Sequence, residues 1–104
     1  MDANRKLEIL KTCNLAQKNH WQLMCDLSSN DRNIRYFDGR ESVNVNLNEY
    51  LEDNDNINDV LKFLIEYLDE YSDTQMKFVK ENHYYNEYYK GVIDEINFLI
   101  YMIG

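Results

Sequence analysis

Apolar and aromatic residues recur at steps of three and four from Ile57 to Ile103, which is the spacing of one face of an α-helix. The stripe runs through Ile57, Leu61, Leu64, Leu68, Tyr71, Gln75, Phe78, Asn82, Tyr85, Tyr89, Val92, Ile96, Leu99 and Ile103. The chain of 104 residues contains no Pro and only three Gly, so few residues interrupt a helix. The sequence therefore predicts a mainly α protein.

The stripe in the C-terminal half fits either one helix or two. A single helix over residues 57–103 would be about 70 Å long, whereas a compact chain of this size has a radius of gyration of about 13 Å. Ser72 and Gln75 match a capping box, which marks the start of a helix. We therefore expect two helices, over residues 58–71 and 73–103. The second helix, roughly 45 Å long, still overhangs a compact body, which favours a homodimer through the C-terminal helix as one alternative.

The first segment, from Asp2 to Ser28, has the same helical spacing. Its apolar face consists of Leu7, Leu10, Cys13, His20 or Trp21, Met24 and Leu27. Asp2 is a suitable N-cap, and the polar run over residues 28–31 is typical of a helix end. An amphipathic helix is predicted here.

Residues 33–47 show a different pattern, in which apolar and polar residues alternate. The apolar positions are Ile34, Tyr36, Val43, Val45 and Leu47. The pair Asp38-Gly39 between them favours a type I′ turn, because both central residues of that turn need positive φ. The expected fold is thus a single domain over residues 1–104, with three helices and a small β-hairpin inserted between the first and second helices.

Negative charge is concentrated in one quarter of the chain. The net charge is −8, yet residues 1–48 carry six acids and seven bases, and residues 74–104 carry four acids and three bases. Between them lie nine acids and a single base, Lys62. The acids are Glu49, Glu52, Asp53, Asp55, Asp59, Glu66, Asp69, Glu70 and Asp73. Either a solvated face or a docking surface for a basic partner explains them, and direct binding of nucleic acid or anionic lipid is disfavoured.

Several of these acids fall on one side of the helix expected from residue 58. Asp59, Glu66 and Asp73 are seven residues apart, opposite the apolar face. The acids of this helix supply about one charge per 4 Å, against about one per 1.7 Å along a DNA duplex. The sequence predicts partial mimicry of nucleic acid, not a full surrogate.

The nine tyrosines are a second unusual feature, and four of them lie within residues 83–89. Tyr85 and Tyr89 belong to the apolar stripe, so we expect them in the core. Tyr84 and Tyr88 lie at its border. They are candidate partner-binding residues, because Tyr is enriched at binding hot spots.

Residue sets typical of an enzyme or a metal site are missing from the sequence. His20 and His83 have no partner at metal-ligand spacing. Cys13 and Cys25 lie on or near the apolar stripe, with Lys11 as the nearest base and no following His, so we expect inert thiols. We therefore expect a non-enzymatic protein with no catalytic residue, metal or cofactor. No apolar run approaches the length of a membrane span and no signal peptide opens the chain, so a cytoplasmic location is expected.

The run from Tyr88 to Tyr101, YYKGVIDEINFLIY, resembles the ending of many small phage-encoded proteins. Residues with AT-rich codons (Asn, Ile, Lys and Tyr) are abundant, and those with GC-rich codons (Gly, Ala and Pro) are scarce. With its small size and acidity, the chain is similar to phage accessory proteins of the anti-CRISPR and anti-defence kind. This resemblance implies an acidic inhibitor that binds a basic, nucleic-acid-binding surface of a host defence nuclease.

Two other classes of function fit the same sequence. An immunity protein or antitoxin that neutralises a basic toxin needs the same electrostatics. A homodimeric helical protein with a structural or regulatory role would use the C-terminal stripe instead. The residues alone do not separate these alternatives.

Overall fold

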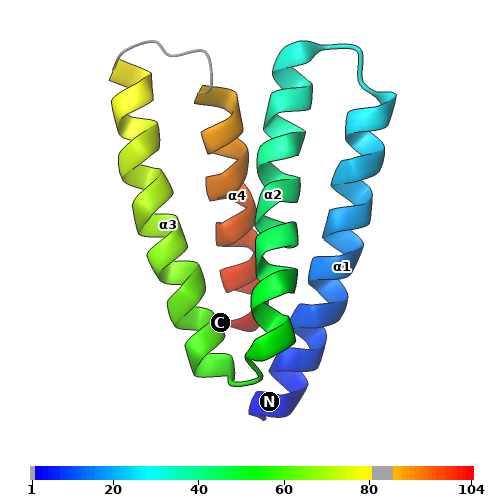
Figure 1. Ribbon diagram of the computed structural model, residues 1–104, viewed down its shortest axis with the longest axis vertical. Coiled ribbons are helices and arrows are strands. Elements are labelled where there is room, and N and C mark those ends of the chain that lie inside the picture. The colour runs from blue at the N-terminus through cyan, green and yellow to red at the C-terminus, as the bar shows by residue number, and fades with distance from the viewer. Residues whose placement is uncertain (1, 81–85) are drawn as a thin grey trace.

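The computed structural model describes residues 2–80 and 86–104. These residues form four helices and no strand: α1 (Ala3–Leu27), α2 (Asp31–Asp53), α3 (Ile57–Lys80) and α4 (Asn86–Ile103). Successive helices run in opposite directions, and both ends of the chain lie at the same end of the bundle (Figure 1). The molecule measures 42 × 30 × 21 Å along its principal axes.

Short polar side chains define the starts of the first three helices. The Asp2 carboxylate accepts a hydrogen bond from the backbone N–H of Arg5 (2.8 Å), as predicted for the N-cap of α1. The Asn30 amide oxygen does the same for Asn33 (3.1 Å), and that of Asn56 accepts from Asn58 (2.9 Å). Each cap satisfies backbone donors that have no partner within the helix. The caps at Asn30 and Asn56 thus mark the ends of two short connections, residues 28–30 and 54–56.

Helices α2 and α4 run in the same direction and form the centre of the bundle (Figure 1). They meet at two glycines, which are both buried. A Cβ atom added to Gly39 would overlap the backbone oxygen of Tyr88, and one added to Gly91 would overlap the backbone oxygen of Tyr36. Only glycine allows two helix backbones to approach this closely. The reciprocal contact fixes how α2 and α4 are aligned.

The two remaining helices flank this central pair, α1 beside α2 and α3 beside α4 (Figure 1). All four helices contribute to one apolar core. Its buried members are Leu7, Leu10, Val43, Leu47, Leu51, Ile57, Val60, Leu64, Tyr67, Val92, Ile96, Leu99 and Ile103. The arrangement is a helical bundle, as the dominant helical spacing of the sequence requires.

The predicted β-hairpin is wrong, because residues 33–47 lie inside α2. Val43, Leu47 and Leu51 share one buried face of that helix, at the spacing of four residues that the short alternation concealed. Gly39 serves the α2–α4 contact and not a turn. The Asp-Gly pair therefore reflects tertiary packing, not local turn chemistry.

The predicted boundaries of the last two helices are also wrong. Helix α3 continues to Lys80 through the expected break, where the Thr74 hydroxyl donates to the backbone oxygen of Glu70 (2.9 Å). Helix α4 then begins at Asn86. Four residues of the C-terminal stripe, Val92, Ile96, Leu99 and Ile103, are buried in the core of the single chain. That face is therefore not left free for a second copy. The first helix is confirmed.

Candidate binding groove between α2 and α3

An open groove of about 610 Å³ separates the C-terminal half of α2 from α3. Ten residues line it: Asn46, Glu49, Tyr50, Asp53 and Asn54 from the α2 side, and Phe63, Glu66, Tyr67, Glu70 and Tyr71 from α3. On each helix they recur at steps of three and four, so each set lies on one face. We call this feature the α2–α3 groove.

Aromatic rings form the floor of the groove. Tyr50 of α2 stacks on Phe63 of α3, with ring centroids 4.2 Å apart and planes 11° from parallel. The series continues along α3, where Phe63 contacts Tyr67 (5.8 Å) and Tyr67 contacts Tyr71 (5.0 Å). Tyr71 then contacts Tyr89 of α4 (5.6 Å). These rings hold α3 to the rest of the bundle where its backbone stands away from α2.

Two hydrogen bonds join α2 to α3, and the first of them crosses the groove. The Asn46 side-chain amide donates to the Tyr67 hydroxyl (2.8 Å), and the Tyr50 hydroxyl donates to the backbone oxygen of Asp59 (3.4 Å). Burial raises the pKa of Tyr67. Burial, together with the neighbouring Tyr67 and other tyrosines and Glu70, raises the pKa of Tyr71 to about 12. Both phenols are therefore neutral at physiological pH and present uncharged π faces to the groove.

Four carboxylates line the groove above the rings: Glu49, Asp53, Glu66 and Glu70. All four are exposed. Among the residues that the structure describes, none of the four forms an ion pair, and no Lys or Arg lines the groove. The groove therefore combines an aromatic floor with negative charge that no side chain described here neutralises.

The structure brings together some of the predicted partner-binding acids and leaves the others apart. Glu52, Asp55, Asp59, Asp69 and Asp73 are exposed but do not line the groove.

The two tyrosines predicted to bind a partner do not extend the groove. Tyr88 is half-buried against the apolar core, and Tyr84 lies outside the described residues.

Sequence reasoning missed the aromatic floor itself. Phe63, Tyr67 and Tyr71 are four residues apart along α3, which is a visible signal for a row of rings on one helix face. Tyr50 gives no such signal, because its pairing with Phe63 depends on how two helices meet.

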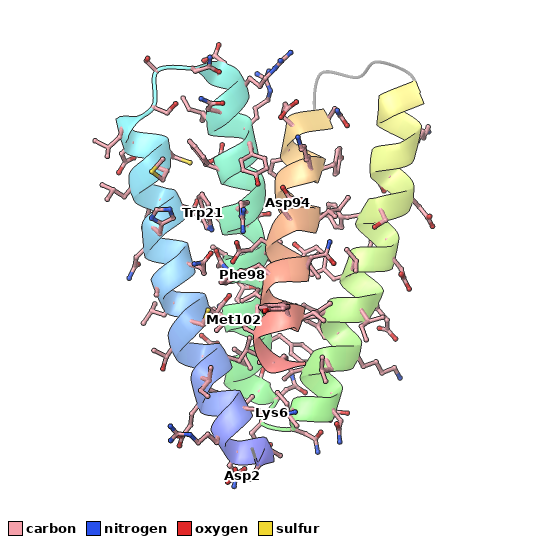
Figure 2. The ribbon with its side chains drawn as sticks, turned by 180° about the vertical axis from the view of Figure 1, so that it is seen from behind. Asp2, Lys6, Trp21, Asp94, Phe98 and Met102 are labelled. Atoms are coloured by element: carbon pink, nitrogen blue, oxygen red, sulfur yellow. The ribbon has the colours of Figure 1, made fainter. Side chains whose placement is uncertain are left out.

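A second polar cluster lies on the other side of the central pair, around the fully buried Glu95 of α4. Its carboxylate accepts hydrogen bonds from the Trp21 indole (3.0 Å), the Arg40 guanidinium (2.9 Å) and the Asn44 amide (2.9 Å). The Arg40 guanidinium also lies over the Trp21 ring, 4.3 Å from its centroid. Figure 2 shows Trp21 on α1 near the level of Asp94 on α4. The carboxylate, the guanidinium and the indole thus satisfy one another inside the bundle, whereas the Asn44 side-chain oxygen is buried without a hydrogen-bond partner in the described part of the chain. The cluster joins α1, α2 and α4.

Neither cysteine has the character of a nucleophile. The Cys25 thiol donates to the Asp38 carboxylate (3.2 Å), and burial together with that carboxylate raises its pKa to about 12. Burial and the charge of Glu95 raise the pKa of Cys13. Thiolates, the reactive form, are therefore rare at neutral pH. Within residues 2–80 and 86–104, no three His, Cys, Asp or Glu side chains are placed to hold a metal ion.

No protein family, curated protein or solved structure matches this chain. In the part of the chain that the structure describes, no helix has both the length and the apolar character needed to span a membrane.

Proposed function

We propose that this chain is a non-enzymatic acidic inhibitor, which binds a basic, nucleic-acid-binding surface of a nuclease through residues 49–73. One observation carries the proposal. The nine acids of this segment are all exposed, and none of them forms an ion pair among the described residues.

The electrostatics of this segment suit a binding protein better than a merely soluble one. Solubility requires an excess of charge of one sign, but it does not require that the charge be concentrated at the end of α2 and along α3. Clustered charge steers a positive partner toward one surface and raises the rate of association. Because the charge density is below that of DNA, the inhibitor would compete with nucleic acid for part of a basic surface.

The class of nuclease follows from the resemblance of the chain to phage accessory proteins. We propose an origin in a phage or mobile element and a defence nuclease of the host as the target. Small size, strong acidity and AT-rich amino-acid usage support this origin.

The test is a titration of the purified chain into a panel of bacterial RNA-guided and restriction nucleases, with DNA cleavage followed on gels. At least one nuclease should be inhibited at a stoichiometry near one to one, and added salt should weaken the inhibition. A variant with Asp59, Glu66, Glu70 and Asp73 changed to Lys should lose it. Inhibition that persists in this variant would refute the proposal.

A further inference from the structure

Resting on the proposed function, we infer that the α2–α3 groove takes an arginine side chain of the basic partner. The guanidinium would stack on the aromatic floor and donate hydrogen bonds to the carboxylates that line the groove. This assigns the anchoring contact to one place on the acidic surface.

The chemistry of the groove matches a cation with a flat face. Aromatic rings attract cations through the negative potential of their faces, and carboxylates accept charge-assisted hydrogen bonds. The groove offers both within about 610 Å³, a volume typical of sites that hold a small ligand or a side chain. An anionic or purely apolar occupant would leave Glu49, Asp53, Glu66 and Glu70 facing it without compensation.

The molecule itself contains the proposed arrangement. Inside the bundle the Arg40 guanidinium lies 4.3 Å from the centroid of the Trp21 ring and donates to the Glu95 carboxylate at 2.9 Å. Ring, carboxylate and guanidinium thus satisfy one another on the α1 side. The groove on the α3 side presents the ring and carboxylate components without a guanidinium among the described residues.

Arginine is favoured over lysine by its shape and hydration. A guanidinium is planar, can stack on a ring while its edge donates to carboxylates, and is more weakly hydrated than an ammonium group. The lysine ammonium group carries the same charge, but it is compact and has no flat face that can stack on a ring. Selectivity between these two side chains therefore separates the proposed anchor from simple attraction between opposite charges.

The probe is the peptide acetyl-Gly-Arg-Gly-Arg-Gly-amide, compared with its lysine counterpart, and binding is followed by NMR of the labelled full chain. The arginine peptide should bind at least about three-fold more tightly than the lysine peptide. It should shift the aromatic signals of Tyr50, Phe63, Tyr67 and Tyr71. Equal affinity for the two peptides would overturn the inference.

Two pairs of substitutions of equal charge locate the binding site. Glu66→Gln with Glu70→Gln neutralises two acids that line the groove, and Asp69→Asn with Asp73→Asn neutralises two acids of α3 outside it. The first pair should weaken binding of the arginine peptide about ten-fold, and the second less than three-fold. Equal weakening by the two pairs would show that diffuse charge, not the groove, binds the peptide.

Aromatic substitutions provide a readout that does not change charge. Tyr71→Leu removes a ring of the groove, whereas Tyr101→Leu removes a ring that is 82% exposed on α4. Only Tyr71→Leu should reduce the preference for arginine over lysine. Circular dichroism of each variant shows whether the bundle is retained, and a retained preference in folded Tyr71→Leu contradicts the inference.

The two proposals fail in different ways. If nuclease inhibition is lost on charge reversal while the peptides show no arginine preference, the inhibitor function stands and the groove anchor is wrong. If the arginine peptide binds in the groove while no nuclease is inhibited, the anchor stands and the proposed function is wrong.

Discussion

Helices α1 and α3 both flank the central α2–α4 pair, but they are attached to it in different ways. Helix α1 is joined by side-chain hydrogen bonds. Trp21 donates to Glu95 (3.0 Å), Asn14 donates to the backbone oxygen of Asn44 (2.9 Å), and the Asn44 amide donates to the Asn14 side chain (2.9 Å). Besides its apolar core residues, helix α3 is joined to α2 by the stacked rings of Tyr50 and Phe63 and by two hydrogen bonds, with the α2–α3 groove beside them. One edge of the bundle is closed and the other is open.

The two sides differ in whether their carboxylates are paired with a cation inside the molecule. On the α1 side the carboxylate of Glu95 is wholly buried and is neutralised by Arg40, which is 15% exposed. On the α3 side the groove carboxylates are exposed, and no ion pair involves them in the described residues. Charges that are paired inside specify how helices associate, whereas charges left outside remain available to another molecule.

The largest effect is expected from breaking the buried pair on the α1 side. Arg40→Met leaves the Glu95 carboxylate buried without its cation, so the free energy of unfolding should fall by about 3–5 kcal/mol. Urea denaturation followed by circular dichroism measures it. Arg32→Met, at an exposed position of the same helix, should change it by less than about 0.5 kcal/mol.

A double variant distinguishes the effect of the unpaired Glu95 charge from a general disruption of the fold. Replacing both partners, as Arg40→Met with Glu95→Leu, removes the uncompensated charge and should recover part of the lost stability. A loss below about 1 kcal/mol for Arg40→Met alone would show that the α1 side is not held by this pair.

The second largest effect on the free energy of unfolding is expected at the contact between α2 and α4, the central pair that both α1 and α3 flank. Gly39→Ala should lower the free energy of unfolding by about 2–3 kcal/mol, because the added methyl group overlaps the backbone of Tyr88. Helix propensity alone would raise the free energy of unfolding by about 1 kcal/mol. The sign of the measured change therefore shows whether overlap with the Tyr88 backbone or helix propensity dominates. Thermal and urea melts measure it, and Asn97→Ala on the exposed face of α4 is the control.

The glycines show why sequence reasoning succeeded for some elements and failed for others. Helix α1 was predictable, since its cap at Asp2 and its spacing are local properties. The role of Gly39 was not, because an Asp-Gly pair suits a turn equally well unless the Tyr88 backbone is known to lie against it. Tertiary packing decided between two local conformations that the sequence permits.

The features of the α2–α3 groove likewise fall into those that the sequence predicts and those that it does not. Its carboxylates were predicted, because net charge along the chain can be counted directly. Its aromatic floor was not, since the contact of Tyr50 with Phe63 depends on the angle at which α3 leaves α2. The ring contact of Tyr71 with Tyr89, which lies outside the groove, likewise depends on how α4 packs against α3.

Alkaline pH is expected to weaken the α3 side. Because folding raises the pKa of Tyr71 from an ordinary value of 10 to about 12, its contribution to stability is fully present below pH 10 and is lost as the pH rises towards 12. Denaturant melts at pH 9 and pH 11 should show the loss. The loss of stability between pH 9 and pH 11 should be smaller in Tyr71→Phe and unchanged in Tyr101→Phe. An equal loss in the original protein and both variants would contradict the assignment of this loss to Tyr71.

A smaller effect is expected from the hydrogen bond that crosses the groove. Tyr67→Phe removes the hydroxyl that accepts from Asn46, so the free energy of unfolding should fall by about 0.5–1 kcal/mol. Equilibrium urea melts detect this change. No measurable loss would mean that stacking alone joins α3 to α2 at this point.

The smallest effect has the opposite sign and separates stability from binding. Glu66 and Glu70 are one helical turn apart and repel each other, so Glu66→Gln with Glu70→Gln should raise the free energy of unfolding by about 0.2–0.5 kcal/mol at low salt. The gain should shrink in 1 M salt, where charges are screened beyond about 3 Å. Asp69→Asn with Asp73→Asn, equally spaced on α3, should give a similar gain.

If both pairs stabilise the fold but only the groove pair weakens the arginine peptide, the groove carboxylates lower stability while they serve binding. That is the reverse of Glu95, whose charge is paired within the fold. If the groove pair instead destabilises the bundle, Glu66 and Glu70 have a structural role. The contrast between a closed α1 edge and an open α3 edge would then be wrong.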